Sequence, residues 1–197
     1  MYSKAMRVIK IIILFSISLL TSCGTKQIKT DDDYIIFQKV LEDRKLQGYT
    51  VVKEANSDGL VELLDEEYPV FFALWENNFK DLISYDDAKK IFNDDDVKNY
   101  YLKLNKQHHW PSSYHDKFIT KHEIDSLRKD KNFIESFRGL AILTLSPILY
   151  TKDKNFALIR FDSGNISILY NGKGGGLMIY KKENGEWNLL AQLFNYF

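Results

Sequence analysis

The chain has 197 residues, of which 45% are hydrophobic and 14% aromatic, and 27 Lys plus Arg balance 27 Asp plus Glu. This length corresponds to one domain, and the apolar content is too high for intrinsic disorder. A formal net charge of zero gives no sign of the basic surface that nucleic-acid binding requires. Cys23 is the only cysteine, which excludes a disulfide framework and a zinc site built from cysteines.

The first 22 residues have the pattern of a secretory signal peptide. Lys4, Arg7 and Lys10 accompany an apolar run over residues 11–20 that is interrupted only by serines. A helix of that length spans about 15 Å, against roughly 30 Å of membrane hydrocarbon, so the run is too short for a stable transmembrane helix. Residues 1–22 are therefore predicted to be a signal peptide that is removed.

The apolar run leads into Leu20-Thr21-Ser22-Cys23-Gly24, which resembles the lipobox of bacterial lipoproteins. In that family the cysteine thiol receives a diacylglycerol, signal peptidase II cleaves before the cysteine, and the new amino group is usually acylated with a fatty acid such as palmitate. The resemblance implies that Cys23 anchors the mature chain to a membrane, because two or more acyl chains give stable anchoring. An ordinary secreted protein with a cysteine near its cleavage site and an uncleaved membrane anchor are the alternatives.

The residues after Cys23 bear on its location. Gly24 stands where, by resemblance to enterobacterial sorting rules, an aspartate retains lipoproteins in the inner membrane, so the outer membrane is favoured. Residues 23–33 are predicted to be the acylated cysteine and a flexible tether with an r.m.s. reach of roughly 17 Å. Residues 34–197 are predicted to form a single domain, whose first helix Asp33 would cap.

The domain begins with a helical pattern. Residues 34–46 place four apolar side chains on one helical face, and Gly48 is expected to end this helix. The four are Ile36, Phe37, Val40 and Leu41. Residues 49–64 are then predicted to form a hairpin around the turn Asn56-Ser57-Asp58-Gly59.

An amphipathic helix is predicted to begin at Pro69. Its apolar stripe extends to Ile83 and is the strongest in the chain, so we expect it to face the core. Ser84 with Asp87 resembles a capping box that starts a short helix.

Asn93 or Asp94 is predicted to start the next helix. The run Asp94-Asp95-Asp96 lacks the alternating ligands and central glycine of an EF-hand loop, so helix capping is favoured over calcium binding. Thr120 with Glu123 forms a second capping box, which opens a helix through about Lys129.

The last third of the chain changes to a strand pattern. Short apolar runs separated by turn residues predict strands over residues 141–150, 156–162, 166–170, 177–182 and 187–194. The intervening turns include residues 163–165 and 171–176. No helix-length segment separates these runs, so consecutive strands are expected to pair antiparallel. The predicted fold class is α+β, with N-terminal helices packed on a C-terminal antiparallel β-meander.

Asn184-Gly185 is a strong signal for a type I′ hairpin turn. With these residues at the turn centre, three opposed pairs share one sheet face with Leu193. The pairs are Lys182 with Trp187, Tyr180 with Leu189, and Met178 with Ala191. We expect that face to be the buried one and Trp187 to belong to the core.

The order of turn and core residues in this sheet resembles the C-terminal sheet of small uncharacterised bacterial lipoproteins. The residues that carry the resemblance are Ser146-Pro147, Asp153-Lys154, Ala157-Leu158, Gly174 to Gly176, Tyr180, Asn184-Gly185 and Trp187. The resemblance covers residues 84–194 and implies a fold but no activity. Many of those proteins carry a cysteine pair in the glycine loop, and this chain has no cysteine there.

All four histidines lie close together in the sequence, with Asp116, Glu123 and Asp125 nearby. They are His108, His109, His115 and His122. Histidine and carboxylate side chains ligate zinc, but the spacing lacks HExxH and Trp110-Pro111 interrupts any helix that would align the ligands. A solvated polar loop is therefore favoured over a metal site, and His108, His115 and His122 remain the candidate ligands.

Other chemical motifs are incomplete. Residues 171–176 lack the spacing of a phosphate-binding loop, and Ser112, Ser113 and Ser163 have no nucleophile-elbow context. No cofactor is predicted. The leading expectation is a non-catalytic envelope lipoprotein that binds another protein or an envelope ligand. The alternative is a metal-dependent or small-ligand enzyme that uses the His108–His122 region.

Overall fold

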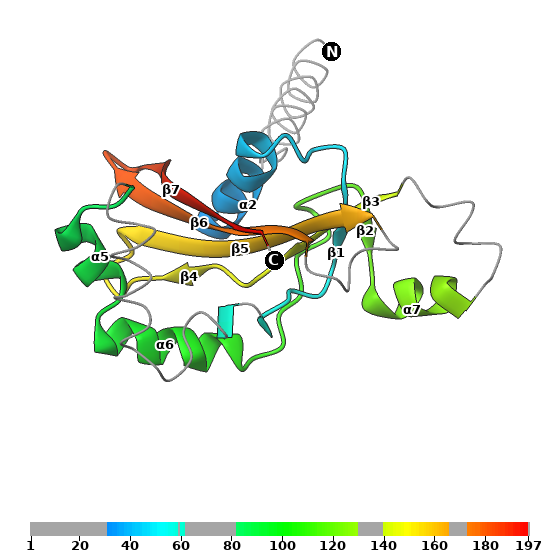
Figure 1. Ribbon diagram of the computed structural model, residues 1–197, viewed down its shortest axis with the longest axis horizontal. Coiled ribbons are helices and arrows are strands. Elements are labelled where there is room, and N and C mark those ends of the chain that lie inside the picture. The colour runs from blue at the N-terminus through cyan, green and yellow to red at the C-terminus, as the bar shows by residue number, and fades with distance from the viewer. Residues whose placement is uncertain (1–30, 59, 62–81, 130–139, 166–172, 197) are drawn as a thin grey trace, which may run out of the picture. The chain divides into compact units, whose positions relative to one another are not determined.

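The computed structural model of the protein describes residues 31–58, 60–61, 82–129, 140–165 and 173–196 (Figure 1). The chain divides into two compact units, Met1–Asp32 and Asp33–Phe197, and the fold described below is that of the second. The strand predicted over residues 166–170 lies outside the described residues. So does the helix predicted from Pro69, except for Leu82 and Ile83.

The fold class is α+β, which confirms the prediction, with helices early in the chain and a largely antiparallel sheet at its C-terminal side. The elements are α2 (Asp32–Asp43), β1 (Thr50–Val52), α5 (Tyr85–Ile91), α6 (Asp94–Leu104), β2 (Phe118–Ile119), α7 (Lys121–Lys129), β3 (Ala141–Leu145), β4 (Leu149–Tyr150), β5 (Phe156–Asn165), β6 (Lys173–Glu183) and β7 (Glu186–Tyr196). The described strands form one seven-stranded sheet in the order β2-β1-β3-β5-β6-β7, with β4 paired to β5.

Helices α5 and α6 begin at predicted capping residues. The Ser84 hydroxyl accepts a hydrogen bond of 3.1 Å from the Asp87 backbone N–H. Asn93 rather than Asp94 caps α6, and its side-chain oxygen accepts from the Asp96 backbone N–H at 3.0 Å. Each bond satisfies an N–H group that has no partner inside the first helical turn.

Helix α7 begins with the predicted reciprocal capping box. The Glu123 backbone N–H donates to Thr120 Oγ1 at 3.1 Å, and the Thr120 backbone N–H donates to Glu123 Oε2 at 2.7 Å. The Thr120 hydroxyl also donates to Glu123 Oε2 at 2.8 Å. The two bonds that Thr120 donates to this carboxylate lower the pKa of the Glu123 carboxyl, because hydrogen bonds to a carboxylate favour its charged form.

Helix α2 buries the four predicted side chains, but both of its ends differ from the prediction. It begins at Asp32, so Asp33 lies in the first turn and is not the cap. It ends before Lys45, which has a φ of 55°, and not at Gly48. The Leu46 N–H donates to the Leu41 carbonyl at 2.7 Å, a bond typical of a Schellman ending in which Lys45 takes the left-handed position that glycine usually occupies.

The predicted hairpin over residues 49–64 is wrong. Strand β1 pairs parallel with both β2 and β3, and Val51 lies opposite Phe118 and Leu143. The Ser57 carbonyl instead accepts from the backbone N–H groups of Leu60 and Val61, as in a turn of helix. The physical reason is that consecutive valines of β1 are both buried, which is typical of a strand covered on both faces.

Three predicted boundaries in the C-terminal sheet are also wrong. The run over residues 141–150 is split into β3 and β4, because Ser146 leaves the strand and bonds through its N–H and hydroxyl to the backbone of Arg160. Residues 163–165 and 173–176 belong to strands rather than turns. Gly175 is required by crowding, since a Cβ there would lie 2.0 Å from Asp162 Oδ1.

The hairpin between β6 and β7 has the predicted turn, with φ of 54° at Asn184 and 87° at Gly185. The pairs nearest the turn are confirmed, namely Lys182 with Trp187 and Tyr180 with Leu189. Trp187 is buried as predicted, and Lys182 Nζ lies 5.1 Å from its ring centroid.

A β-bulge at Leu190 overturns the rest of the predicted register. Ala191 lies opposite Ile179, and Met178 lies opposite Gln192. The extra residue reverses the alternation, so Trp187 and Ala191 belong to different core clusters and do not share one buried face. The side chain of Leu189, which we expected in the core, is 40% exposed.

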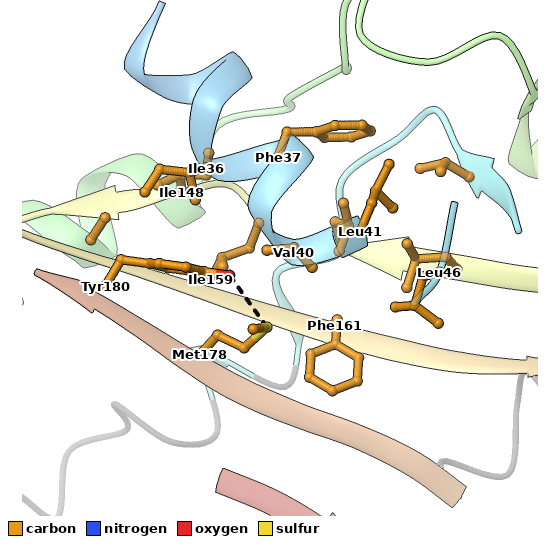
Figure 2. Close-up of a cluster of buried hydrophobic side chains, with 14 of the residues drawn as sticks. Ile36, Phe37, Val40, Leu41, Leu46, Ile148, Ile159, Phe161, Met178 and Tyr180 are labelled. Carbon is orange, nitrogen blue, oxygen red and sulfur yellow. Dashed lines mark hydrogen bonds between the residues drawn. The ribbon is translucent and has the colours of Figure 1, made fainter. Parts of the chain in front are cut away.

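Apolar side chains cover both faces of the sheet. The face that packs against α2, here called the α2 face, carries one cluster that includes Ala157, Ile159, Phe161 and Trp187. Figure 2 shows side chains of α2 directed toward Ile159, Met178 and Tyr180. The Tyr180 hydroxyl also donates to Asp43 Oδ2 at 3.0 Å.

The opposite face, here called the α6 face, carries two separate clusters. One joins α5 and α6 to Leu158, Leu177 and Ile179, and the other joins α7 to Val52 and Ile142. The strand alternation places a polar strip between them. Its members are Thr144, Arg160, Asp162 and Gly175.

Arg160 and Asp162 form an ion pair within this strip. Arg160 Nε and Nη2 donate to the two carboxylate oxygens of Asp162 at 3.2 and 3.1 Å. The side chains are 12% and 25% exposed, and the two-pronged geometry strengthens the pair. An ordered ion pair therefore interrupts the apolar surface of the α6 face.

Candidate functional site

The four histidines of the sequence do not converge on one point. His109 is exposed and bridges Glu54 through the backbone, and His122 is exposed on α7. His115 Nε2 lies 2.9 Å from the carbonyl oxygen of Tyr49. Among the residues that the structure describes, no group of three His, Cys, Asp or Glu side chains is placed to hold a metal ion.

Two of the histidines instead join an aromatic cluster between α2 and the segment that precedes β2. The cluster consists of Tyr34, Phe37, His108, Trp110, Tyr114, His115 and Phe118. Segments far apart in the sequence therefore meet here, because the amphipathic face of α2 needs an apolar partner.

Phe37 and Tyr114 make the central contacts of the aromatic cluster. The Phe37 ring centroid lies 5.2 Å from that of Trp110 and 5.5 Å from that of Tyr114. Tyr34 packs edge-to-face on Tyr114 at 5.3 Å, an arrangement that aromatic quadrupoles favour. The Gln38 side chain donates to the Tyr114 carbonyl at 2.5 Å. Tyr34 and Tyr114 are half-buried and bring the cluster to the protein surface.

The backbone of residues 108–110 is held against the segment after β1. The Trp110 N–H donates to the Lys53 carbonyl at 2.9 Å, and the Ala55 N–H donates to the His108 carbonyl at 3.0 Å. The expected solvated loop is therefore wrong for this part of the chain, where Trp110 is only 1% exposed. The sequence signal that was available is the single tryptophan between the histidines, because a large aromatic side chain contributes strongly to a core.

His108 and Trp110 form a contact with unusual hydrogen bonding. Their rings meet edge-to-face, with centroids 4.9 Å apart and planes at 79°. Nε2 of His108 and Nε1 of Trp110 are buried, and neither has a hydrogen-bond partner among the described residues. An edge-to-face pair can direct only one N–H group at the other ring. Within the described part of the chain, at least one polar nitrogen is therefore buried without compensation, and an uncompensated buried group costs about 1–3 kcal/mol.

Burial also controls the charge of His108. Burial is the largest effect on the pKa of the imidazole and lowers it below 6.5. The negative charge of Asp33 raises this pKa, and the positive charge of Lys103 lowers it further. Asp33 Oδ1 accepts from the Tyr150 hydroxyl at 2.7 Å, and Lys103 Nζ lies 5.2 Å from the Tyr150 ring centroid. At neutral pH, His108 is uncharged, and its tautomer decides whether Nε2 donates or accepts.

A polar pocket of about 350 Å³ lies at the start of α6. It is lined by Lys90, Asn93, Asp95, Asp96, Lys152 and Asp153. The carboxylate of Asp96 is fully engaged, because its oxygens accept from the Lys152 backbone N–H at 2.7 Å and from Asn93 Nδ2 at 2.5 Å. These bonds tie the start of α6 to the turn between β4 and β5.

Comparison of the chain with protein-family models, curated proteins and solved structures gives no match. The resemblances to bacterial lipoproteins therefore remain predictions. Within the described part of the chain, no helix is both long enough and apolar enough to cross a membrane. Cys23 and the apolar run before it lie outside the described residues.

Proposed function

We propose that the protein is a lipid-anchored component of the bacterial cell envelope whose folded domain binds another protein or an envelope ligand without catalysis. The anchor rests on the sequence Leu20-Thr21-Ser22-Cys23 after a short apolar run. Acylation of Cys23 would hold the domain at the membrane surface, and Gly24 favours the outer membrane over the inner.

The binding role rests on the aromatic cluster. Half-buried Tyr34, Tyr114 and His108 form its rim. The ring nitrogens of His108 and Trp110 that have no hydrogen-bond partner among the described residues belong to the same cluster. Ligand sites typically combine aromatic lining with a few polar groups, and an unsatisfied buried polar group in a native protein calls for an explanation. A partner that inserts a hydrogen-bonding group beside Trp110 would satisfy one of these nitrogens.

The anchor can be tested by labelling cells with a radioactive fatty acid. Cys23→Ser is expected to abolish incorporation of the label and to leave an unprocessed precursor, because the thiol is the acceptor of the lipid. Ser16→Ala, in the apolar run, is the matched control and should be labelled and processed. Fatty-acid label in Cys23→Ser would contradict the anchor.

The binding role can be tested by affinity isolation of the native protein from solubilised envelopes. We expect a specific partner that is lost in His108→Phe and Tyr114→Ala and kept in Tyr85→Ala, which changes an exposed tyrosine of α5. Elemental analysis of the same preparations tests the enzyme alternative. One equivalent of zinc, iron or manganese that disappears in His108→Ala, His115→Ala or His122→Ala would contradict the proposal and support a metal-dependent activity.

A further inference from the structure

The two edges of the sheet differ greatly in length. At one edge, β7 extends over 11 residues and pairs with β6 alone among the described strands (red in Figure 1). At the other edge, β2 has only 2 residues. The backbone hydrogen bonds among described residues outside helices and ladders do not involve β7. A strand in this position presents a row of N–H and C=O groups that another strand can pair with.

The β7 edge has few of the features that keep sheet edges apart. Residues 187–197 contain no Asp, Glu, Lys, Arg or Pro, whereas natural edge strands commonly carry charged residues or proline. Glu186 at the start of β7 and two irregularities in its pairing with β6 are the protective features, and the second irregularity is the bulge at Leu190. Beyond it, the run from Ala191 to Asn195 pairs regularly with β6 and offers a second, uninterrupted stretch of edge.

The chemistry of this edge selects its partner. An incoming strand must be long and must tolerate a neutral, largely apolar neighbour. The other edge of a second copy is too short, because pairing with β2 would leave most of β7 open. The β7 strand of a second copy matches in length and in charge, and antiparallel pairing of identical strands produces a twofold contact that closes on itself.

We propose that two copies of this chain associate through antiparallel pairing of their β7 strands, so that their sheets become continuous. The proposal is independent of the lipid anchor and of the aromatic cluster. Leu189 is the natural place to disrupt the contact. In a hairpin with a two-residue turn the flanking pair is hydrogen-bonded, so the backbone N–H of Leu189, three residues after Glu186, points away from β6.

The test is the mass of the full chain in detergent, measured by sedimentation over a range of concentrations. The unaltered chain should be a dimer. Leu189→Lys should raise the dimer dissociation constant roughly tenfold or more, because the twofold contact brings the two new charges together. Leu102→Lys is the matched control, since this leucine of α6 is 65% exposed, and it should remain dimeric.

Cross-linking in intact membranes locates the contact. A bis-maleimide should join two copies of Leu189→Cys but not two copies of Leu102→Cys, and the unaltered chain controls for reaction at Cys23. A monomeric unaltered chain, or a dimer that survives Leu189→Lys, would overturn the proposal. Cross-linking of Leu189→Cys to a different protein would also overturn it and would show that a heterologous strand occupies this edge.

Discussion

The α2 face and the α6 face of the sheet are built from alternate residues of the same strands, yet they are organised differently. On the α2 face, Ile159 and Phe161 of β5 continue one apolar cluster along the strand. On the α6 face, Arg160 and Asp162 interrupt the apolar surface between two clusters. The difference shows that the α2 face has one continuous apolar core, while the α6 face joins two apolar clusters across a polar contact with strict geometry.

The largest expected effect comes from the α2 face. Trp187→Ala should lower the free energy of unfolding by roughly 3–5 kcal/mol, because it removes a large buried side chain from a continuous cluster. Denaturant unfolding followed by circular dichroism measures the change. Leu102→Ala, at an exposed site of α6, should shift the midpoint little. An unshifted midpoint in Trp187→Ala would show that the ring does not belong to the buried cluster of the α2 face.

The next largest effect tests the polar strip of the α6 face. Gly175→Ala should destabilise the protein by about 1–3 kcal/mol, because the new Cβ would lie 2.0 Å from Asp162 Oδ1 and 2.8 Å from the Phe161 carbonyl oxygen. The same denaturation measurement applies. Gly48→Ala is the matched control, since no heavy atom lies within 4 Å of a Cβ there. Equal stability of the two variants would mean that the strip is not rigid.

A smaller effect concerns the second cluster of the α6 face, to which α7 contributes. Thr120→Ala should cost about 1 kcal/mol, because it removes the hydroxyl that accepts from the Glu123 N–H. Ser126→Ala changes a hydroxyl inside the same helix, which bonds to the His122 carbonyl, and should be neutral or slightly stabilising. Amide hydrogen exchange of α7 compares them. Faster exchange in Ser126→Ala than in Thr120→Ala would contradict the capping assignment.

The smallest expected effect is a pH dependence on the side of α2. The pKa of folded His108 lies below its ordinary value of 6.5, so the unfolded chain takes up the proton first as the pH falls. The contribution of His108 to stability is therefore complete above pH 6.5 and is lost progressively as the pH falls toward the folded-state pKa. Unfolding midpoints between pH 7.5 and 5 measure this loss.

His108→Gln should reduce this acid sensitivity, because glutamine does not titrate. His122→Gln, which changes an exposed histidine of α7, should leave the sensitivity unchanged. If His122→Gln reduced the acid sensitivity and His108→Gln did not, the group responsible for the pH dependence would lie outside the aromatic cluster.

Local signals in the sequence predicted local structure well. Ser84, Asn93 and Thr120 cap helices because the bonds that they make reach only three residues along the chain. The turn Asn184-Gly185 predicted the strand pairs next to it for the same reason. The apolar face of α2 could be predicted because its spacing repeats over several turns.

Features that depend on distant partners could not be predicted. The parallel pairing of Val51 depends on Phe118 and Leu143, and nothing near Val51 specifies them. The sequence placed Gly175 in a loop. The structure requires glycine there because the carboxylate of Asp162, on another strand, leaves no room for a Cβ. At the candidate site, the histidine pattern predicted the segment that contributes His108 and His115 to the aromatic cluster. Trp110 is buried because it contacts α2 and the segment after β1. Residue spacing in the sequence does not indicate that these two segments lie next to Trp110.

The position of β1 between β2 and β3 has a consequence for how the chain folds. The ribosome synthesises Val51 early, but the residues that pair with it, Phe118 and Leu143, come much later in the chain. The apolar face of α2 likewise packs against residues of strands β3 to β7, which are synthesised later. Such long-range pairing slows folding, because the entropy of closing large loops must be lost before the contacts form. The N-terminal part of the domain therefore stays without its native partners until most of the chain has been synthesised.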